Sequence, residues 1–197
     1  ERLEVVPLPH QQETALPYAD IGLADRLDTL LRTHRMVFIP SPPCRRPELS
    51  DKVNTAEAAI VAEAMRRVRL MLGAAFDPAN SIGVIVPYRN QIAVIRRKAE
   101  RFDMPELEAV SIDTVERYQG SQRDVIIYSF TVQSEWQLEF LAGSCFDDGG
   151  HTIDRKLNVA LTRARRQTIM TGNAATLGLN PVFKRLMEYV REKGGVL

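Results

Sequence analysis

Three polar segments of the sequence carry side chains that suit the binding of phosphate groups. They read PYRNQ at 87–91, DTVERYQGSQRD at 113–124 and DRKLNVALTRARR at 154–166. Arginine presents a planar fork of N–H donors that matches phosphate oxygens. Hydroxyl and amide side chains donate to phosphate or sugar, and a glycine lets the backbone approach a ligand closely. These residue types indicate recognition of a phosphate-bearing ligand.

The third segment predicts an amphipathic helix over 154–166 with one basic face. At about 100° per residue, Lys156 falls on the same side as three arginines, Arg155, Arg163 and Arg166, while leucines and alanines share the other side. One interpretation is an ordinary solvated face. The other is an anion-facing helix from which Arg163 projects toward a phosphate. The spacing alone leaves both open.

The other two segments also allow a plain structural role. Thr114, Gly120 and Gln122 fall between two expected strands, where a polar turn with a glycine is common. Tyr88 and Gln91 could cap a helix that follows the preceding strand. Neither segment by itself identifies a functional site.

Several familiar motifs are missing from the sequence. It contains no GxxxxGKS/T, no GxGxxG and no strand that ends in paired acids able to hold magnesium. A complete nucleotide hydrolase site is therefore not expected within this chain.

Cys44 and Cys145 lie far apart with no CxxC spacing, and the three histidines form no cluster, so we expect neither a metal site nor a disulfide. This cysteine usage suits a reducing compartment.

Composition narrows the class of protein further. Lys and Arg number 26 against 25 Asp and Glu, for a net charge of +1, and 45% of residues are hydrophobic. Balanced charge excludes a histone-like polyelectrolyte, so any nucleic-acid binding must be local. No apolar run approaches about 18 residues and the first residues lack the charged-then-apolar order of a signal peptide, which predicts a soluble cytoplasmic protein without a membrane partner. Because the chain begins with Glu1, we expect a piece excised from a longer protein.

Strands and helices alternate along the expected fold. Short apolar runs predict five strands, at 36–40, 81–87, 109–113, 124–132 and 167–172. Helical patterns run from a cap at Asn54 to Gly73, over 92–102, and from Asn180 to Gly194. The alternation predicts a mainly parallel α/β sheet, and such sheets bind ligands beyond the carboxyl ends of their strands.

The chain divides into two regions in this interpretation. Residues 1–35 form a connecting segment with one helix near 20–32, and residues 36–197 form the main domain. Residues 133–154, which hold three glycines and the single tryptophan, are expected to form a long loop insertion.

The order and spacing of the three polar segments resemble a known family. SIGVIVPYRNQ, VSIDTVERYQGSQRDVIIYSF and RKLNVALTRARRQTIMTGN resemble motifs IV, V and VI of superfamily 1 DNA and RNA helicases, especially the nonsense-mediated-decay and replication branch. The resemblance runs from Phe38 to Val190. It implies a RecA-like fold with helices on both faces of the sheet, namely the second motor domain of a P-loop NTPase helicase, without a Walker A motif of its own.

The resemblance also implies roles for single residues. Arg163 matches the arginine finger, the catalytic residue of motif VI that approaches the γ-phosphate of ATP. The other ATP-binding positions match Gly120, Gln122 and Gln91, and the nucleic-acid-binding positions match Thr114, Tyr88 and Asn158. The family usually has Glu where this chain has Gln122, and an amide can hydrogen-bond a ribose hydroxyl but cannot act as a base.

The function implied is that of an ATP-dependent nucleic-acid helicase or translocase, with ATP and Mg held mainly by a first motor domain outside this sequence. Its partners would be that first RecA-like domain and single-stranded nucleic acid, DNA in preference to RNA. The alternative is a non-catalytic RecA-like module that binds nucleic acid or a partner without turnover. This chain alone is expected to lack ATPase activity, because it lacks the phosphate-binding lysine and the magnesium-binding acids.

Overall fold

Parallel strands form the sheet on which the other elements pack. The computed structural model describes residues 16–43, 52–118, 121–143, 145–148 and 151–197, and within these ranges the main sheet has five strands. Their order across the sheet is β1 (Met36–Pro40), β7 (Ala164–Gly172), β4 (Arg123–Ser129), β2 (Ile82–Val86) and β3 (Ser111–Thr114). Every neighbouring pair is parallel, which confirms the predicted sheet.

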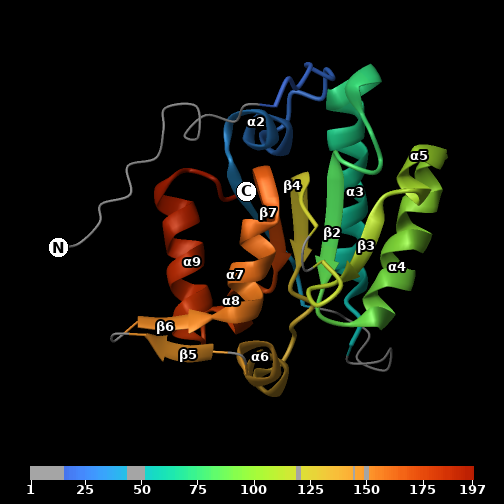
Figure 1. Cartoon of the computed structure of the whole chain (residues 1–197). Helices are drawn as coiled ribbons and strands as arrows, with labels where there is room; N and C mark the ends of the chain where they lie inside the picture. Colours follow the sequence, from blue (N-terminus) through green and yellow to red (C-terminus); the bar gives the residue numbers. More distant parts are fainter. Residues whose placement is uncertain (1–15, 44–51, 119–120, 144, 149–150) are drawn as a thin grey trace.

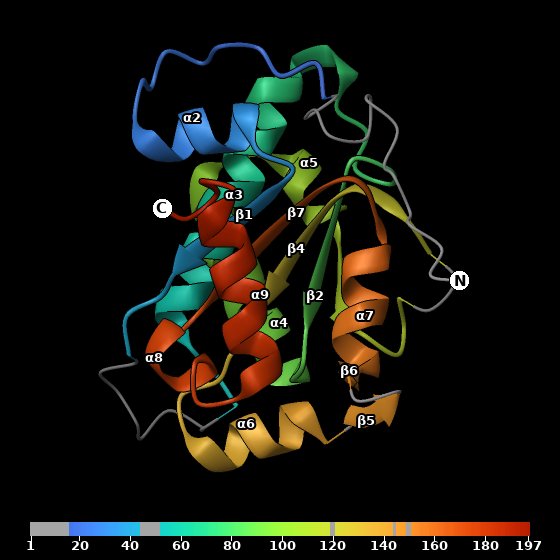
Figure 2. The same cartoon turned by 90° about the vertical axis from the view of Figure 1, so that its left-hand side faces the viewer.

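Helices cover both faces of this sheet, as the sequence predicts (Figures 1 and 2). The helices packed on one face are α2 (Arg26–Thr33), α3 (Thr55–Leu72), α4 (Arg89–Ala99) and α5 (Pro105–Glu108), with short turns η1 (Gly73–Ala75) and η2 (Glu100–Phe102). Those on the other face are α6 (Glu135–Ala142), α7 (Arg155–Thr162), α8 (Ala174–Leu177) and α9 (Pro181–Glu192). The architecture is α/β and consistent with a RecA-like domain.

Successive side chains of each strand point to opposite faces of the sheet, and this alternation produces two apolar layers. In β1, Val37 and Ile39 belong to the core under α3, whereas Phe38 belongs to the core under α9. All five residues of β2 are buried. Strands covered on both faces need apolar residues at every position, and this is why they appear in the sequence as continuous runs.

The predicted helix caps are confirmed. The Asn54 side chain accepts hydrogen bonds from the backbone N–H groups of Ala56 and Glu57 at 3.0 Å, and α3 ends where Gly73 adopts a φ of 52°. The Asn180 side chain accepts from the Val182 N–H at 2.9 Å, with Pro181 as the first residue of α9. These caps fix both ends of α3 and the start of α9.

Two predictions about local structure are wrong. The helix predicted over 154–166 ends at Thr162, because the chain then pairs with β4 and Ala164 lies opposite Arg123 in the sheet. Arg165 and Arg166 therefore belong to β7, and no continuous basic helix face forms. The region 133–154 contains α6 and a hairpin of β5 (Cys145–Asp148) and β6 (His151–Asp154), not simply a loop.

The segment before β1 is held to the sheet by one buried amide. The Tyr18 hydroxyl donates to Gln167 Oε1 at 2.7 Å, and Gln167 Nε2 donates to the backbone carbonyls of Leu31 and His34, each at 2.7 Å. The predicted helix near 20–32 is present as α2, capped by the Asp25 carboxylate. Residues 1–15 of the predicted connecting segment lie outside the described residues.

A buried carboxyl group joins three elements at the carboxyl edge of the sheet. Glu57 of α3 is fully buried and accepts from Ser129 Oγ at 2.7 Å, at the end of β4, and from Thr131 N at 2.8 Å, just after it. It also accepts from Ser41 Oγ at 3.3 Å, after β1, and from Asn54 Nδ2 at 3.2 Å. Burial raises the pKa of Glu57 to about 7, although these four donors oppose the rise.

The raised pKa of Glu57 predicts a particular pH dependence of stability. Because the folded state holds this proton more tightly than the unfolded chain, the contribution is complete below about 4.5 and is lost as pH rises through about 7. A tenfold difference in proton affinity corresponds to about 1.4 kcal/mol, so the free energy of unfolding should fall by about 3 kcal/mol across this range from Glu57 alone. Glu57→Gln removes this titration.

Urea unfolding of both proteins at a series of pH values tests this expectation. The wild-type free energy of unfolding minus that of Glu57→Gln should decrease steadily between pH 4.5 and 7. Taking the difference removes the contribution of histidines and other groups that both proteins share. Two parallel profiles would show that Glu57 does not titrate in this range.

Candidate functional site

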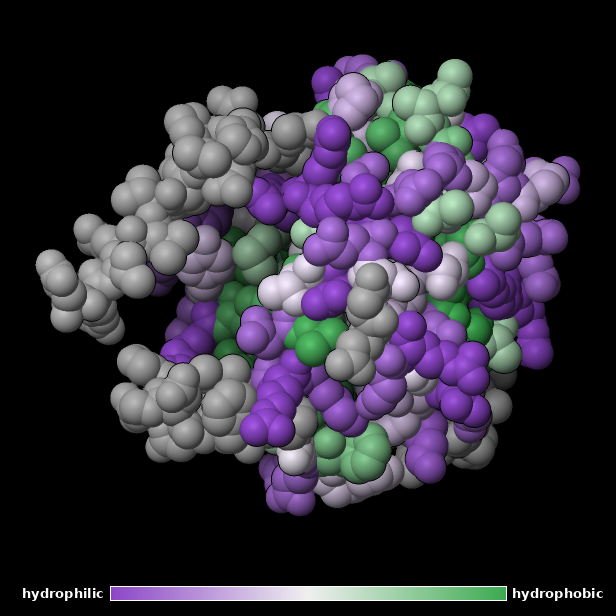
Figure 3. All heavy atoms as spheres, viewed as in Figure 1, coloured by the Kyte–Doolittle hydropathy of each residue, from purple (hydrophilic) through white to green (hydrophobic). Residues whose placement is uncertain are grey.

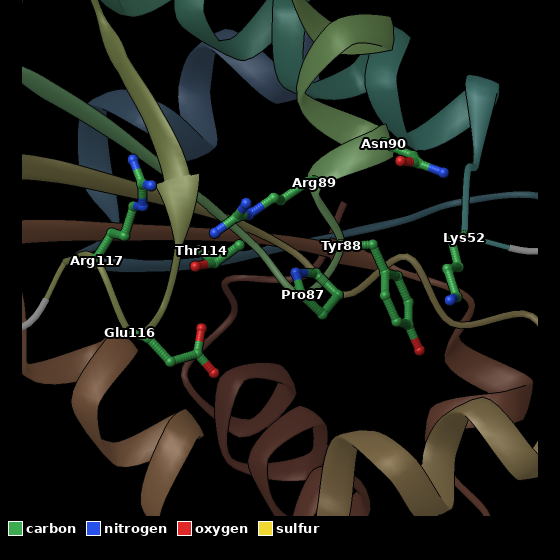
Figure 4. A pocket seen from close by; sticks show the side chains of 8 residues that line it. All are labelled: Lys52, Pro87, Tyr88, Arg89, Asn90, Thr114, Glu116 and Arg117. Atoms are coloured by element: carbon green, nitrogen blue, oxygen red, sulfur yellow. The ribbon is translucent and has the colours of Figure 1, made fainter.

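A polar pocket opens at the carboxyl ends of β2 and β3, the edge at which the sequence predicts ligand binding. Its volume is about 460 Å³. The residues that line it are Lys52, Pro87, Tyr88, Arg89, Asn90, Thr114, Glu116 and Arg117 (Figure 4). The structure thus brings together Thr114 and Tyr88, two of the three residues predicted to bind nucleic acid.

Cations outnumber anions in the lining of this pocket. Lys52, Arg89 and Arg117 come from three different segments, and Glu116 is the single acidic residue among the lining residues. Figure 4 shows the Arg89 guanidinium extending toward Thr114, with the Glu116 carboxylate facing the same open space. This charge pattern suits a ligand that carries several negative charges.

The acidic member of the lining is kept ionised by its neighbours. Burial alone would raise the pKa of Glu116, but its own backbone N–H, the Thr114 hydroxyl and the Lys156 ammonium together hold the pKa below its usual value. Lys156 Nζ lies 3.2 Å from Glu116 Oε1. Because α7 carries Lys156, this contact ties the start of α7 to the rim of the pocket.

Gln91 has a structural role beneath the pocket, and the prediction that it binds ATP finds no support in its surroundings. Its side chain is fully buried, and both amide atoms pair with the backbone of Asn54, through Asn54 N to Oε1 and Nε2 to Asn54 O, each at 2.9 Å. With both polar atoms satisfied, the amide links the start of α4 to the start of α3.

The connection between β3 and β4 crosses the domain from one edge of the sheet to the other. It leaves the carboxyl end of β3 at Thr114 and reaches the amino end of β4 at Arg123. Tyr118 anchors it, because the ring is 2% exposed and the hydroxyl donates to Ser111 O at 2.7 Å. The ring lies against Gly83, where a Cβ atom would come within 2.7 Å of the tyrosine oxygen.

Arg163 lies at the amino edge of the sheet, close to the far end of that connection. It is the C-terminal cap of α7, half-buried, and its carbonyl accepts from Arg123 N at 3.0 Å. Its guanidinium Nε donates to Val159 O at 3.3 Å. The neighbouring Arg165 donates to the Gln122 carbonyl at 3.4 Å, so the structure places Gln122 and Arg163 on one edge.

Two predicted residues remain. Asn158 is exposed on α7 and is not among the residues that line the pocket. Gly120 lies outside the described residues. Sequence reasoning missed Lys52, Arg89 and Arg117, although both arginines stand inside the polar segments and their charge was a usable signal.

Two further observations concern metals and membranes. In the part of the chain that the structure describes, no three His, Cys, Asp or Glu side chains are grouped closely enough to hold a metal ion. Among the same residues, none of the helices has the length and apolar character needed to cross a bilayer.

Comparison with known proteins identifies relatives of this chain. The family model described as AAA domain matches residues 22–175. The putative helicase MOV-10 of Gallus gallus is 33% identical over 149 residues, which cover 72% of this chain and 15% of that protein. The DNA polymerase alpha-associated DNA helicase A of Saccharomyces cerevisiae is 35% identical over 151 residues, or 75% of this chain and 20% of that protein.

A third relative comes from the decay branch. Regulator of nonsense transcripts 1 of Dictyostelium discoideum is 31% identical over 145 residues, 72% of this chain and 10% of that protein. The chain therefore spans no more than about a fifth of the length of these relatives. The match covers β1, β2, β3, β4 and β7, and with them both edges of the sheet described above. By this match the chain belongs to the AAA domain family, as a superfamily 1 helicase domain of the nonsense-mediated-decay and replication branch.

Proposed function

We propose that this chain is the second RecA-like motor domain of an ATP-dependent helicase or translocase that moves along single-stranded DNA. The observation that carries the proposal is the β3–β4 connection, which has Thr114 in the pocket at one end and Gln122 beside Arg163 at the other. One short, well-anchored segment thus contacts both candidate ligand surfaces.

The pocket is the proposed nucleic-acid surface. Its cations can neutralise phosphates, and the Thr114 hydroxyl can donate to a backbone oxygen, so binding depends on the backbone and not on the base sequence. A motor that advances along any sequence requires this kind of contact. We favour DNA over RNA, since one of the relatives is named as a DNA helicase associated with DNA polymerase alpha.

The amino edge is the proposed nucleotide surface. Arg163 and the Gln122 amide would contact the phosphates of ATP from one side only. A first motor domain outside this sequence would hold most of the nucleotide and its Mg. An arginine supplied across such a cleft neutralises charge that develops during phosphoryl transfer.

Coupling between the two surfaces would run through this connection. Tyr118 is packed against Gly83 and hydrogen-bonded to Ser111, so a displacement of the connection at Tyr118 would be passed to β2 and β3. Closure around ATP would therefore displace the DNA-binding pocket relative to the first domain.

The pocket predicts a salt-dependent interaction with single-stranded DNA that depends on Arg89. Binding of a fluorescein-labelled oligothymidylate to this chain should weaken as salt rises, because phosphate contacts release counterions. Arg89→Gln should reduce the magnitude of the slope of log Kd against log salt concentration by about 0.7, the value for one phosphate contact on a single strand.

Arg97→Gln is the matched control for this experiment. It removes the same charge from the same helix, at an exposed position outside the pocket. Its slope should equal that of the wild type. Equal slopes for all three proteins would show that Arg89 does not contact phosphate.

The nucleotide edge predicts a strong effect of Arg163→Ala in an enzyme that unites this chain with its first motor domain. Since the arginine acts mainly on charge that develops in the transition state, kcat for ATP hydrolysis should fall by about 10³-fold or more while KM for ATP changes little. Arg163→Lys should restore little of the rate, because an ammonium lacks the guanidinium fork.

The measurement is DNA-stimulated ATP hydrolysis at saturating DNA, with a melting curve to establish that the variant is folded. A folded Arg163→Ala enzyme with wild-type kcat would remove Arg163 from catalysis. Such a result, together with intact DNA binding, would favour the non-catalytic binding module instead.

A further inference from the structure

The outer face of α6 bears two exposed aromatic rings. Trp136 is 50% exposed and Phe140 is 56% exposed, and they stand one helical turn apart on the same face. The opposite face of α6 is buried through Gln137, Leu138 and Leu141. The apolar contacts of that face therefore orient the helix.

The Phe140 ring adjoins the cationic pocket. The Phe140 ring stacks on Tyr88, with centroids 5.8 Å apart and planes inclined by 19°, and Tyr88 lines the pocket. Lys156 Nζ lies 5.5 Å from the centroid of Phe140 and 3.2 Å from Glu116, another lining residue. The pocket and the exposed face of α6 thus form one continuous surface.

Part of the surface near α6 is apolar. Figure 3 shows a largely hydrophilic face with several apolar areas, one of them at the bottom of the view, where Figure 1 places α6. The carboxyl ends of β2 and β4 point toward that same end of the molecule in Figure 1. An apolar patch beside a cluster of cations calls for a ligand that carries both negative charge and flat apolar groups.

We propose that Trp136 and Phe140 form a stacking platform for nucleobases of the single strand whose phosphates lie in the pocket. The inference rests on the proposed function and extends it from backbone contacts to base contacts. A single strand carries phosphates and π-faces along one chain, which matches the two halves of this surface. Every base has a π-face, so stacking adds affinity without selecting a sequence.

The fluorescence of Trp136 reports directly on this platform, because it is the only tryptophan in the chain. Titration of the 197-residue chain with oligothymidylate at low salt should quench Trp136 emission. An abasic strand of the same length, which keeps the phosphates and lacks the bases, should bind more weakly and quench little.

Substitution of Phe140 separates stacking from simple apolar contact. Phe140→Leu keeps an apolar side chain and removes the π-face, and should weaken oligothymidylate binding by about tenfold. Its affinity for the abasic strand should not change. Phe140→Tyr keeps the ring and should bind as the wild type does. Tyr189→Leu is the matched control, since Tyr189 is also 50% exposed but lies on α9, outside the pocket.

Each other outcome has a definite meaning. If Phe140→Leu weakens binding of both strands equally, or of neither, or if oligothymidylate leaves Trp136 emission unchanged, the platform is wrong while the proposed function stands. If the wild-type chain binds neither strand, the proposed function fails and the platform fails with it. Self-association of the chain that Phe140→Leu abolishes would assign this face to a second copy and overturn the proposal.

Discussion

The carboxyl edge of the sheet depends on a single buried carboxyl group. Glu57 accepts from donors that follow β1 and β4 and from the cap of its own helix, and that cap in turn pairs with Gln91 at the start of α4. A buried carboxyl group is costly unless its hydrogen bonds are made, so these segments must stay in register for it to be satisfied. These contacts hold the starts of α3 and α4 to the ends of β1 and β4, and α4 begins with the lining residue Arg89.

The two candidate ligand surfaces lie at opposite ends of the same strands. A parallel sheet separates its amino and carboxyl edges by the length of a strand, so no single side chain reaches both. The β3–β4 connection crosses this distance, and Tyr118 holds its middle against Gly83. A covalent segment that is anchored by a buried side chain transmits displacement better than a chain of surface ion pairs, which solvent and salt weaken.

The sequence predicted the fold well wherever burial on two faces imposed continuous apolar runs. The run at 36–40 corresponds to β1 residue for residue, and the Asn54 and Asn180 caps were correct. It failed where tertiary pairing overrode local pattern, as at the end of α7, where Ala164 joins β4. Sequence reasoning met the same limit at the candidate site. The residue type of Gln91 does not reveal that both polar atoms of its side-chain amide hydrogen-bond to the backbone of Asn54. The α6 helix was missed because nearby glycines suggested a loop, although Trp136 and Phe140 have helical spacing.

The Gln167 amide has a mechanical consequence. It fastens Tyr18 and the end of α2 to β7, four residues after Arg163, through three hydrogen bonds of 2.7 Å. Tension applied to the chain at Leu16 would therefore reach β7 through these hydrogen bonds as well as β1 through the backbone. Shear across several strand hydrogen bonds loads them together, so the domain moves as one body when it is pulled from this side.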